Sequence, residues 1–354
     1  GKGVFKTMAF DKMIVKKLLK KFDDVPFVVK FPDGEEFKVG EGEPQAIIRA
    51  NGGIDMGAVM KSPSLALGEA YMDKTLELEK GDLFEILNMV LAKLEDFASD
   101  FSGLTKIMKT STSKKNQKQE IATHYDIGNE FFELWLDETM SYSCGYFKHE
   151  TDTLYDAQVN KVEHILKKLN LKEGQTLLDI GCGWGYLLIA AAKKYHVKGV
   201  GITLSEEQYK KGQERIKAEG LEGQVEIRLM DYRDLEKSGM TFDRIVSVGM
   251  LEHVSRDNYP LFFKNIDKVL NKKGIVLLHY ISGRQEHDGD PWIKKYIFPG
   301  GIIPSLREII YLIGEYNYYT LDVESLRRHY EKTLLEWSKN YAAKRDVIDT
   351  MFEE

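Results

Sequence analysis

Residues 176–185, TLLDIGCGWG, decide the fold of this chain. Thr176–Ile180 is an apolar run that predicts a buried parallel strand, and Tyr186–Tyr195 (YLLIAAAKKY) predicts the helix that follows it. Glycines between them allow a sharp turn and leave room for a ligand where a Cβ would collide. The stretch therefore predicts the first unit of a doubly wound α/β sheet, although a tight turn without a ligand is the alternative.

The glycine spacing distinguishes this turn from other nucleotide-binding loops. Gly181, Gly183 and Gly185 form G-x-G-x-G, whereas dinucleotide-binding proteins carry G-x-G-x-x-G. The Lys-Ser/Thr pair of a P-loop does not follow. The turn resembles motif I of the S-adenosylmethionine-dependent methyltransferases, which implies a Rossmann-like sheet that binds this cofactor.

Length and composition bound the class of protein. A chain of 354 residues, 43% hydrophobic and 30% charged, is typical of a globular protein with two domains. Its apolar runs fall short of the ~18 residues that span a bilayer, and the lysine-rich start does not resemble a signal peptide. The two cysteines, Cys144 and Cys182, are too few for a disulfide framework, so we expect a cytoplasmic protein. The net charge of −6 argues against nucleic-acid binding.

Residues 1–103 predict a small α+β domain. Strands at 27–31 and 36–39 flank the hairpin signal Pro32-Asp33-Gly34, and a helix is expected over 82–94. A polar linker follows over 104–119, before a catalytic domain over 120–354.

An amphipathic helix is expected over residues 12–22 of the first domain. Its basic face suits the surface of an anionic membrane, but a helix packed on its own domain with lysines for solubility explains the pattern equally well. The apolar face carries Ile14, Val15, Leu18, Leu19 and Phe22, and the basic face carries Lys16, Lys17, Lys20 and Lys21.

Strands and helices alternate in the catalytic domain, which predicts a parallel sheet. The strands are expected at 176–180, 197–204, 225–230, 242–249 and 274–280. Ligands of such sheets bind at the carboxyl ends of the strands. These ends carry residues suited to chemistry, namely Gly181, Thr203, Asp231, Glu252 and His279.

Two positions at the strand ends have a second interpretation. Gln208 is placed to reach a ribose, but it also forms a capping-box pattern, S-x-x-Q, with Ser205. Asp231 is placed to accept from an adenine amino group, with Tyr232 covering the ring, but it also fits an N-cap.

Several motifs in order give the chain a specific resemblance. They are L-G-E-A-Y-M at 67–72, H-Y-D-I-G-N at 124–129, Y-S-C at 142–144, L-D-I-G-C-G-W-G at 178–185, E-H-V at 252–254 and D-P-W-I-K-K-Y-I-F-P at 290–299. From about residue 65 to about residue 337, the chain resembles the cyclopropane-fatty-acyl-phospholipid synthases and is similar to the mycolic acid cyclopropane synthases.

The resemblance implies chemistry at an alkene. A cis double bond in a phospholipid acyl chain takes the methyl group of S-adenosylmethionine, a base removes a proton, and a cyclopropane ring closes, leaving S-adenosylhomocysteine. The implied cofactor-binding residues are Tyr142, Ser143, Gly181, Cys182, Gly183, Thr203, Leu204, Gln208, Asp231 and Tyr232.

The resemblance also implies that the base is a bound bicarbonate. Its ligands would be Cys144, Glu252, His279, the backbone of Ile281, and Tyr330. Glu252 suits the bicarbonate O–H, and the donors suit its other oxygens. Cys144 as a small buried hydrophobe and His279 as a satisfied core histidine are the alternatives. The Cys, Glu and His spacing matches no closed zinc site, so no metal is expected.

An alkene is a poor nucleophile, so a dry site with aromatic rings facing the developing cation is expected. The candidates are Tyr125, Tyr142, Tyr146, Phe147 and Tyr155, although core packing is the alternative for most of them. The implied partners are an unsaturated acyl chain and a phospholipid bilayer, with peripheral association at the inner face of the membrane and a possible homodimer. The rival functions are a methyltransferase that leaves a methyl-branched chain, and a lipid-binding protein on a degenerate fold.

Overall fold

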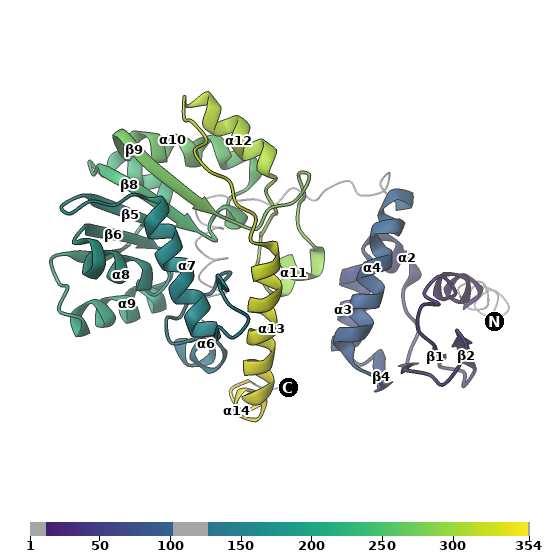
Figure 1. Ribbon diagram of the computed structural model, residues 1–354. Coiled ribbons are helices and arrows are strands. Elements are labelled where there is room, and N and C mark those ends of the chain that lie inside the picture. Colours follow the sequence, from purple (N-terminus) through teal and green to yellow (C-terminus); the bar gives the residue numbers. More distant parts are fainter. Residues whose placement is uncertain (1–11, 102–126, 353–354) are drawn as a thin grey trace. The chain divides into compact units, whose positions relative to one another are not determined.

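The structure is a computed structural model that describes residues 12–101 and 127–352 (Figure 1). The chain separates into two compact units, Gly1–Lys109 with Asp290–Trp292, and Thr110–Gly289 with Ile293–Glu354. The predicted linker at 104–119 lies outside the described residues, so the domain boundaries stay a prediction. No helix in the described ranges is both long and apolar enough to cross a membrane.

The first unit carries a four-stranded sheet in the order β2-β1-β3-β4. The predicted hairpin is confirmed, because β1 and β2 pair antiparallel around the turn, and β3 then joins β1 in parallel. The helix expected over 82–94 is longer, since α4 continues to Phe101. The elements are a helix at 12–19, β1 (Phe27–Lys30), β2 (Glu36–Val39), β3 (Ala46–Ala50), α2 (Met56–Lys61), α3 (Pro63–Met72), β4 (Leu76–Lys80) and α4 (Leu83–Phe101).

The N-terminal helix differs from the expected one in length and in the direction of its lysines. It ends at residue 19, and Leu19 packs against the core of its own sheet. Lys16 forms an ion pair with Glu35, and Lys12 bonds Asp33 at 2.5 Å. Lys16 of the expected basic face is therefore already paired with the acidic hairpin, which favours the alternative of a helix packed on its own domain for this residue. Lys17 and Lys20 are exposed.

The second unit confirms the doubly wound sheet. Its five strands are all parallel, in the order β7-β6-β5-β8-β9. The strand β9 begins four residues earlier than expected, because Leu270 already pairs with Phe242 before a register shift. The strands are β5 (Thr176–Ile180), β6 (Lys198–Thr203), β7 (Val225–Leu229), β8 (Phe242–Val248) and β9 (Leu270–His279).

Helices cover both faces of this sheet and create two cores (Figure 1). Side chains alternate along a strand, so Leu178 of β5 faces one core and Leu177 faces the other. One layer contains α10 (Tyr259–Val269) and α12 (Leu306–Glu315). The other contains α7 (Leu154–Lys168), α8 (Tyr186–Tyr195) and α9 (Glu206–Ala218).

A third, aromatic core joins α6 (Asn129–Trp135) to α13 (Arg327–Ala343). Trp135 and Trp337 meet edge to face, with ring centroids 5.6 Å apart. The remaining elements are η1 (Tyr232–Lys237), η2 (Leu251–His253), η3 (Arg256–Asn258), α11 (Pro291–Tyr296) and α14 (Arg345–Asp349).

The strand order reverses beside β5, since the chain adds β6 and β7 on one side and then β8 and β9 on the other. In open α/β sheets, ligands bind at this reversal, outside the carboxyl ends of the strands. The fold therefore places a binding site above the turns that follow β5 and β8.

Candidate active site

A cavity lies at the reversal point, above Gly181 after β5 and Gly249 after β8. Nearly all residues predicted to bind the cofactor line it, although Asp231 does not. The lining includes Tyr142, Ser143, Gly181, Cys182, Gly183, Thr203, Leu204, Gln208 and Tyr232.

The glycine turn keeps the floor of the cavity free of side chains. Gly181 and Gly183 have φ angles of 76° and 56°, in the left-handed region that favours glycine. A Cβ on Gly183 would meet nothing within 4 Å, so the space above it is open. The N–H groups of Gly181 and Cys182 both donate to Ile202 O, at 3.0 and 3.1 Å, which ties the turn to β6.

At the end of β6, both interpretations of the S-x-x-Q sequence find support. Ser205 is the N-cap of α9, because its Oγ accepts from Gln208 N at 3.2 Å. The Gln208 side chain accepts from Thr203 Oγ1 at 2.9 Å, which leaves the amide nitrogen without a partner among the described residues. This amide is therefore available to a ligand.

Asp231 likewise combines its two predicted roles. Its Oδ1 caps η1 by accepting from Arg233 N at 2.9 Å. Its Oδ2 is buried without a hydrogen-bond partner. Because a buried polar atom without a partner is unfavourable, the second oxygen fits a ligand that brings a donor, such as an adenine amino group.

Besides His253, two further buried ionisable residues in the lining were not predicted. Lys161 of α7 is 4% exposed and donates to Ser143 Oγ at 2.5 Å, and burial lowers its pKa to about 8. Asp179 of β5 is 3% exposed, and burial raises its pKa to about 8. Asp179 Oδ1 has no partner. Both carried a signal in the sequence: an acid inside an apolar strand, and a lysine four residues from Ala157 and Ile165 on the buried face of a helix.

Three of the predicted base ligands, Glu252, Ile281 and Tyr330, form a second cluster beside the cavity. Glu252 Oε1 accepts from Ile281 N at 2.6 Å, and its Oε2 is buried without a partner. Burial raises the pKa of Glu252 to about 7. Tyr330 lies near the Glu252 carboxyl. Burial raises the pKa of Tyr330, and the charges of Glu252 and Cys144 raise it further.

His279 at the end of β9 is neutral, because burial lowers its pKa to about 4. Its Nδ1 has no partner, so it is not the satisfied core histidine of the alternative interpretation. Cys144 is 1% exposed, and burial raises the pKa of its thiol to about 11. The thiol donates to Gly145 O at 3.2 Å, and Gly145 N donates to Thr333 Oγ1 of α13 at 2.9 Å.

The aromatic residues divide between the cavity and other surroundings. Tyr142 lines the cavity and packs within 5.3 Å of Trp337. Tyr146 is stacked between His164 and His329, at 4.4 and 4.6 Å, and Tyr155 is 45% exposed. The prediction of a cation-facing role is therefore wrong for Tyr146, which is packed between imidazoles, and for Tyr155, which faces solvent.

Phe147 and Tyr125 complete the predicted aromatic set. Phe147 lies under Lys332, whose Nζ is 5.9 Å from its ring centroid, so a cation already covers this ring. Tyr125 lies outside the described residues.

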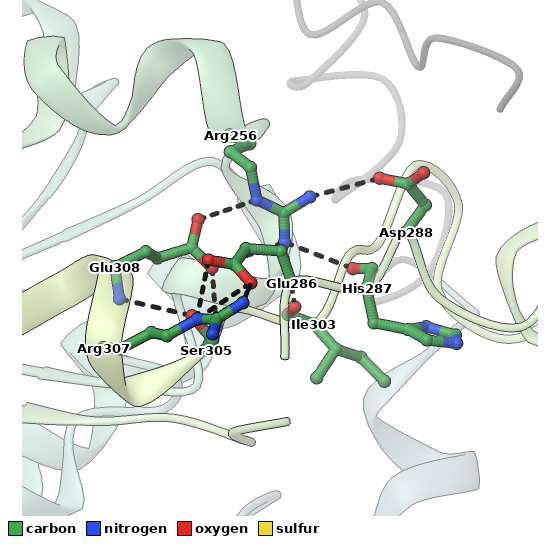
Figure 2. Close-up of polar contacts among 8 residues, drawn as sticks. All are labelled: Arg256, Glu286, His287, Asp288, Ile303, Ser305, Arg307 and Glu308. Atoms are coloured by element: carbon green, nitrogen blue, oxygen red, sulfur yellow. Dashed lines mark hydrogen bonds and ion pairs between the residues drawn. The ribbon is translucent and has the colours of Figure 1, made fainter. Parts of the chain in front are cut away.

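A polar network ties the segment that follows β9 to Arg256 and to α12 (Figure 2). Arg256 donates to Glu308 Oε1 at 2.7 Å, to Asp288 Oδ1 at 3.2 Å and to Ile303 O at 3.1 Å. The adjacent Ile302 N donates to the backbone oxygen of Glu252 at 2.8 Å. The network thereby fixes the backbone that carries Glu252. Within the described ranges, no group of three His, Cys, Asp or Glu side chains is placed to hold a metal ion.

The unpartnered oxygens and the open glycine turn fit a ligand that carries amino groups and an adenosine. The fold and the solved structures similar to it define a class of S-adenosylmethionine-dependent one-carbon transferases. Among solved structures, mycolic acid cyclopropane synthase CmaA1 complexed with SAH and CTAB is similar, with a TM-score of 0.62 and 34% identity, covering 67% of this chain and 87% of that chain. Coclaurine N-methyltransferase bound to SAH has a TM-score of 0.60 and 25% identity, covering 84% and 86%.

Residues 112–354 match the family model described as mycolic acid cyclopropane synthetase, and residues 14–102 match a domain of unknown function. The cyclopropane-fatty-acyl-phospholipid synthase of Escherichia coli (strain K12) is 41% identical over 319 residues, covering 88% of this chain and 81% of that protein. A probable fatty acid methyltransferase of Pseudomonas putida is 40% identical over 323 residues, covering 89% and 81%. The chain therefore belongs to the mycolic acid cyclopropane synthetase family.

Proposed function

We propose that this protein converts the cis double bond of an unsaturated phospholipid acyl chain into a cyclopropane ring, using S-adenosylmethionine and a bound bicarbonate. The observation that carries the proposal is the buried carboxylate of Glu252, whose Oε2 lacks a partner. Its neighbour His253 lines the cavity. A base-holding cluster beside a methyl-transfer cavity suits ring closure, which requires removal of a proton.

Residues of the cavity bind and orient the cofactor, which supplies an electrophilic methyl group when bound. The open turn at Gly181 and Gly183 admits the cofactor backbone. Gln208 of the cavity would offer its amide to the ribose, and Asp231 Oδ2, which follows β7 next to the cavity-lining Met230 and Tyr232, would accept from the adenine amino group. Tyr232, 2% exposed, would cover the adenine ring.

Residues of the second cluster hold the base. Glu252 Oε2 accepts the O–H of bicarbonate, and Tyr330 and the neutral His279 donate to its other oxygens. The N–H of Ile281 is occupied by Glu252 Oε1, so Ile281 acts by orienting that carboxylate. Cys144 contributes a neutral thiol at the edge of the cluster, because its pKa lies well above neutral pH.

The aromatic core beside the cavity suits an alkene nucleophile. Tyr142 packs against Phe132, Trp135 and Trp337, with centroid distances of 5.5, 5.2 and 5.3 Å. These rings exclude water, and their faces stabilise positive charge as it develops on the acyl chain.

The first unit is proposed to bring the enzyme to its substrate at the inner face of the membrane. Lys17 of the N-terminal helix and Lys20, directly after its end, are exposed, in contrast to Lys12 and Lys16, which pair with the hairpin. Exposed lysines near an anionic bilayer contribute about 1 kcal/mol each. A homodimer remains a prediction from the family resemblance.

Mass spectrometry of phospholipids from cells that express the chain tests this function. The proposal expects acyl chains that gain one CH2 and lose the alkene, so that hydrogenation over a mild catalyst adds no hydrogen. A gain of CH2 with a reducible double bond would instead identify a methyl-branching enzyme, as the name of the Pseudomonas putida relative suggests for that protein. Unchanged lipids would refute both activities.

A further inference from the structure

The backbone that follows Cys144 is bonded to two helices in turn. The N–H groups of residues 145 and 147 donate to side chains of α13, the first to Thr333 Oγ1 and the second to His329 Nδ1, both at 2.9 Å. The N–H of residue 146, between them, donates to Ala157 O of α7 at 2.9 Å. Residues 144–147 therefore form a bridge segment, whose successive hydrogen bonds fix α13 relative to α7.

Thr333 is the most deeply buried contact of the bridge segment with α13. Its side chain is 0% exposed, and its hydroxyl accepts from Gly145 N and donates to His329 O at 2.8 Å. A Cβ on Gly145 would lie 2.9 Å from the Ala157 methyl group and 3.4 Å from Thr333 Oγ1, so the glycine permits this close approach. Without the hydroxyl, the buried N–H of Gly145 would lose its acceptor, which is unfavourable.

The two sides of this contact carry residues of the predicted base site. Cys144 directly precedes Gly145, and Tyr330 lies one turn before Thr333 on α13. Gly145 and Thr333 are 188 residues apart in the sequence, so their hydrogen bond joins two distant parts of the site. Neither Thr333 nor His329 is among the described residues that line the cofactor cavity.

We propose that Thr333 and His329 are positioning residues for the bound base. Through the bridge segment, they hold Cys144 and Tyr330 at the spacing that binding of bicarbonate requires. The inference rests on the proposed function and goes beyond it, because both residues act through others rather than by contact with the anion. A merely structural threonine would change the amount of active enzyme, whereas a positioning residue changes how much bicarbonate the reaction needs.

Bicarbonate dependence of the reaction tests the inference. Release of S-adenosylhomocysteine by the full chain is measured on vesicles of dioleoylphosphatidylglycerol, in bicarbonate-depleted buffer to which bicarbonate is added back. For Thr333→Val, the bicarbonate concentration at half-maximal rate should rise about tenfold, the effect of a buried N–H that loses its acceptor. Thr333→Ser keeps the hydroxyl and should restore the wild-type value within about threefold. The KM for S-adenosylmethionine should stay within about twofold, because Thr333 lies outside the cavity lining.

Thr350→Val is the matched control. It removes a threonine hydroxyl that donates to Val347 O at 2.6 Å, at an exposed position outside the bridge segment, and it should leave the bicarbonate requirement unchanged. A lower maximal rate of Thr333→Val at an unchanged bicarbonate requirement would overturn the inference. An equal rise in the KM for S-adenosylmethionine would overturn it as well, because the effect would not be specific to the base.

If Thr333→Val does not fold, His329→Leu decides, because this side chain is only partly buried and provides the second acceptor for the bridge segment. A higher bicarbonate requirement that His329→Asn restores, through its amide oxygen as acceptor, supports the inference, and an unchanged requirement rejects it. A wild-type chain whose rate does not respond to bicarbonate would refute the proposed base itself. That failure is distinguishable, because it occurs without any substitution.

Discussion

Replacing Glu252 by glutamine should change how the stability of this protein depends on pH. Burial raises the pKa of Glu252 from 4.5 to about 7, so between these values the folded protein holds a proton that the unfolded chain has lost. The wild-type protein must therefore lose stability as pH rises through this window, because its folded state binds more protons. Glu252→Gln has no such proton to lose.

The size of the effect follows from the two pKa values. Each pH unit between them corresponds to ~1.4 kcal/mol, so from pH 5 to pH 8 the variant should gain about 2–3 kcal/mol relative to the wild type. For a domain of this size, the difference between the melting temperatures of the variant and the wild type should therefore change by roughly 5–10 °C from pH 5 to pH 8. The amide nitrogen that replaces Oε2 also lacks a partner, but this penalty is the same at both pH values and cancels in the comparison.

Thermal unfolding of both proteins at pH 5 and pH 8 measures this difference. Glu222→Gln, at an exposed position, controls for the loss of one negative charge. Glu252→Gln should also turn over about tenfold to hundredfold more slowly if Glu252 orients bicarbonate. Its affinity for S-adenosylhomocysteine should be nearly unchanged. If the melting temperatures of the wild type and of Glu252→Gln differed by the same amount at pH 5 and at pH 8, the raised pKa of the buried carboxylate would be refuted. Normal turnover in bicarbonate-depleted buffer would refute its role with the base.

Three further predictions concern the cofactor turn, the polar network and the N-terminal helix. Gly183→Ala should lower S-adenosylhomocysteine affinity in calorimetry, because its methyl group enters the open space above a backbone at φ 56°; unchanged affinity would place the ligand elsewhere. Arg256→Met should destabilise the protein by about 1–3 kcal/mol in thermal unfolding and slow turnover, because the backbone beside Glu252 loses its anchor; an unaltered melting temperature would contradict this. Exchanging Lys17 and Lys20 for glutamate should weaken co-sedimentation with anionic liposomes about tenfold or more at low salt, whereas unchanged sedimentation would show that this helix serves only its own domain.

The amino-acid sequence alone determined the parallel sheet and the glycine turn after Thr176–Ile180. Apolar runs with helices between them predict parallel strands, and the glycine spacing after Thr176–Ile180 predicts the ligand position, because both signals are local. Within the parallel sheet, the observed strands differ from the predicted ones at their ends. For example, β9 starts early because its first residue pairs with the neighbouring strand, which the local sequence pattern does not indicate.

The chemistry of the candidate site was decided only by the tertiary structure. Glu252 and Ile281 are 29 residues apart and meet because β8 and β9 end side by side. Lys161 meets Ser143 because α7 packs its buried face beneath the segment that carries the Y-S-C motif. Lys16 turned inward because the hairpin folds its acidic residue beside the helix. Local patterns report which face of an element is buried, but the partner on that face is set by long-range packing, and burial by that partner is what moved the pKa values of Glu252 and Lys161 toward neutrality.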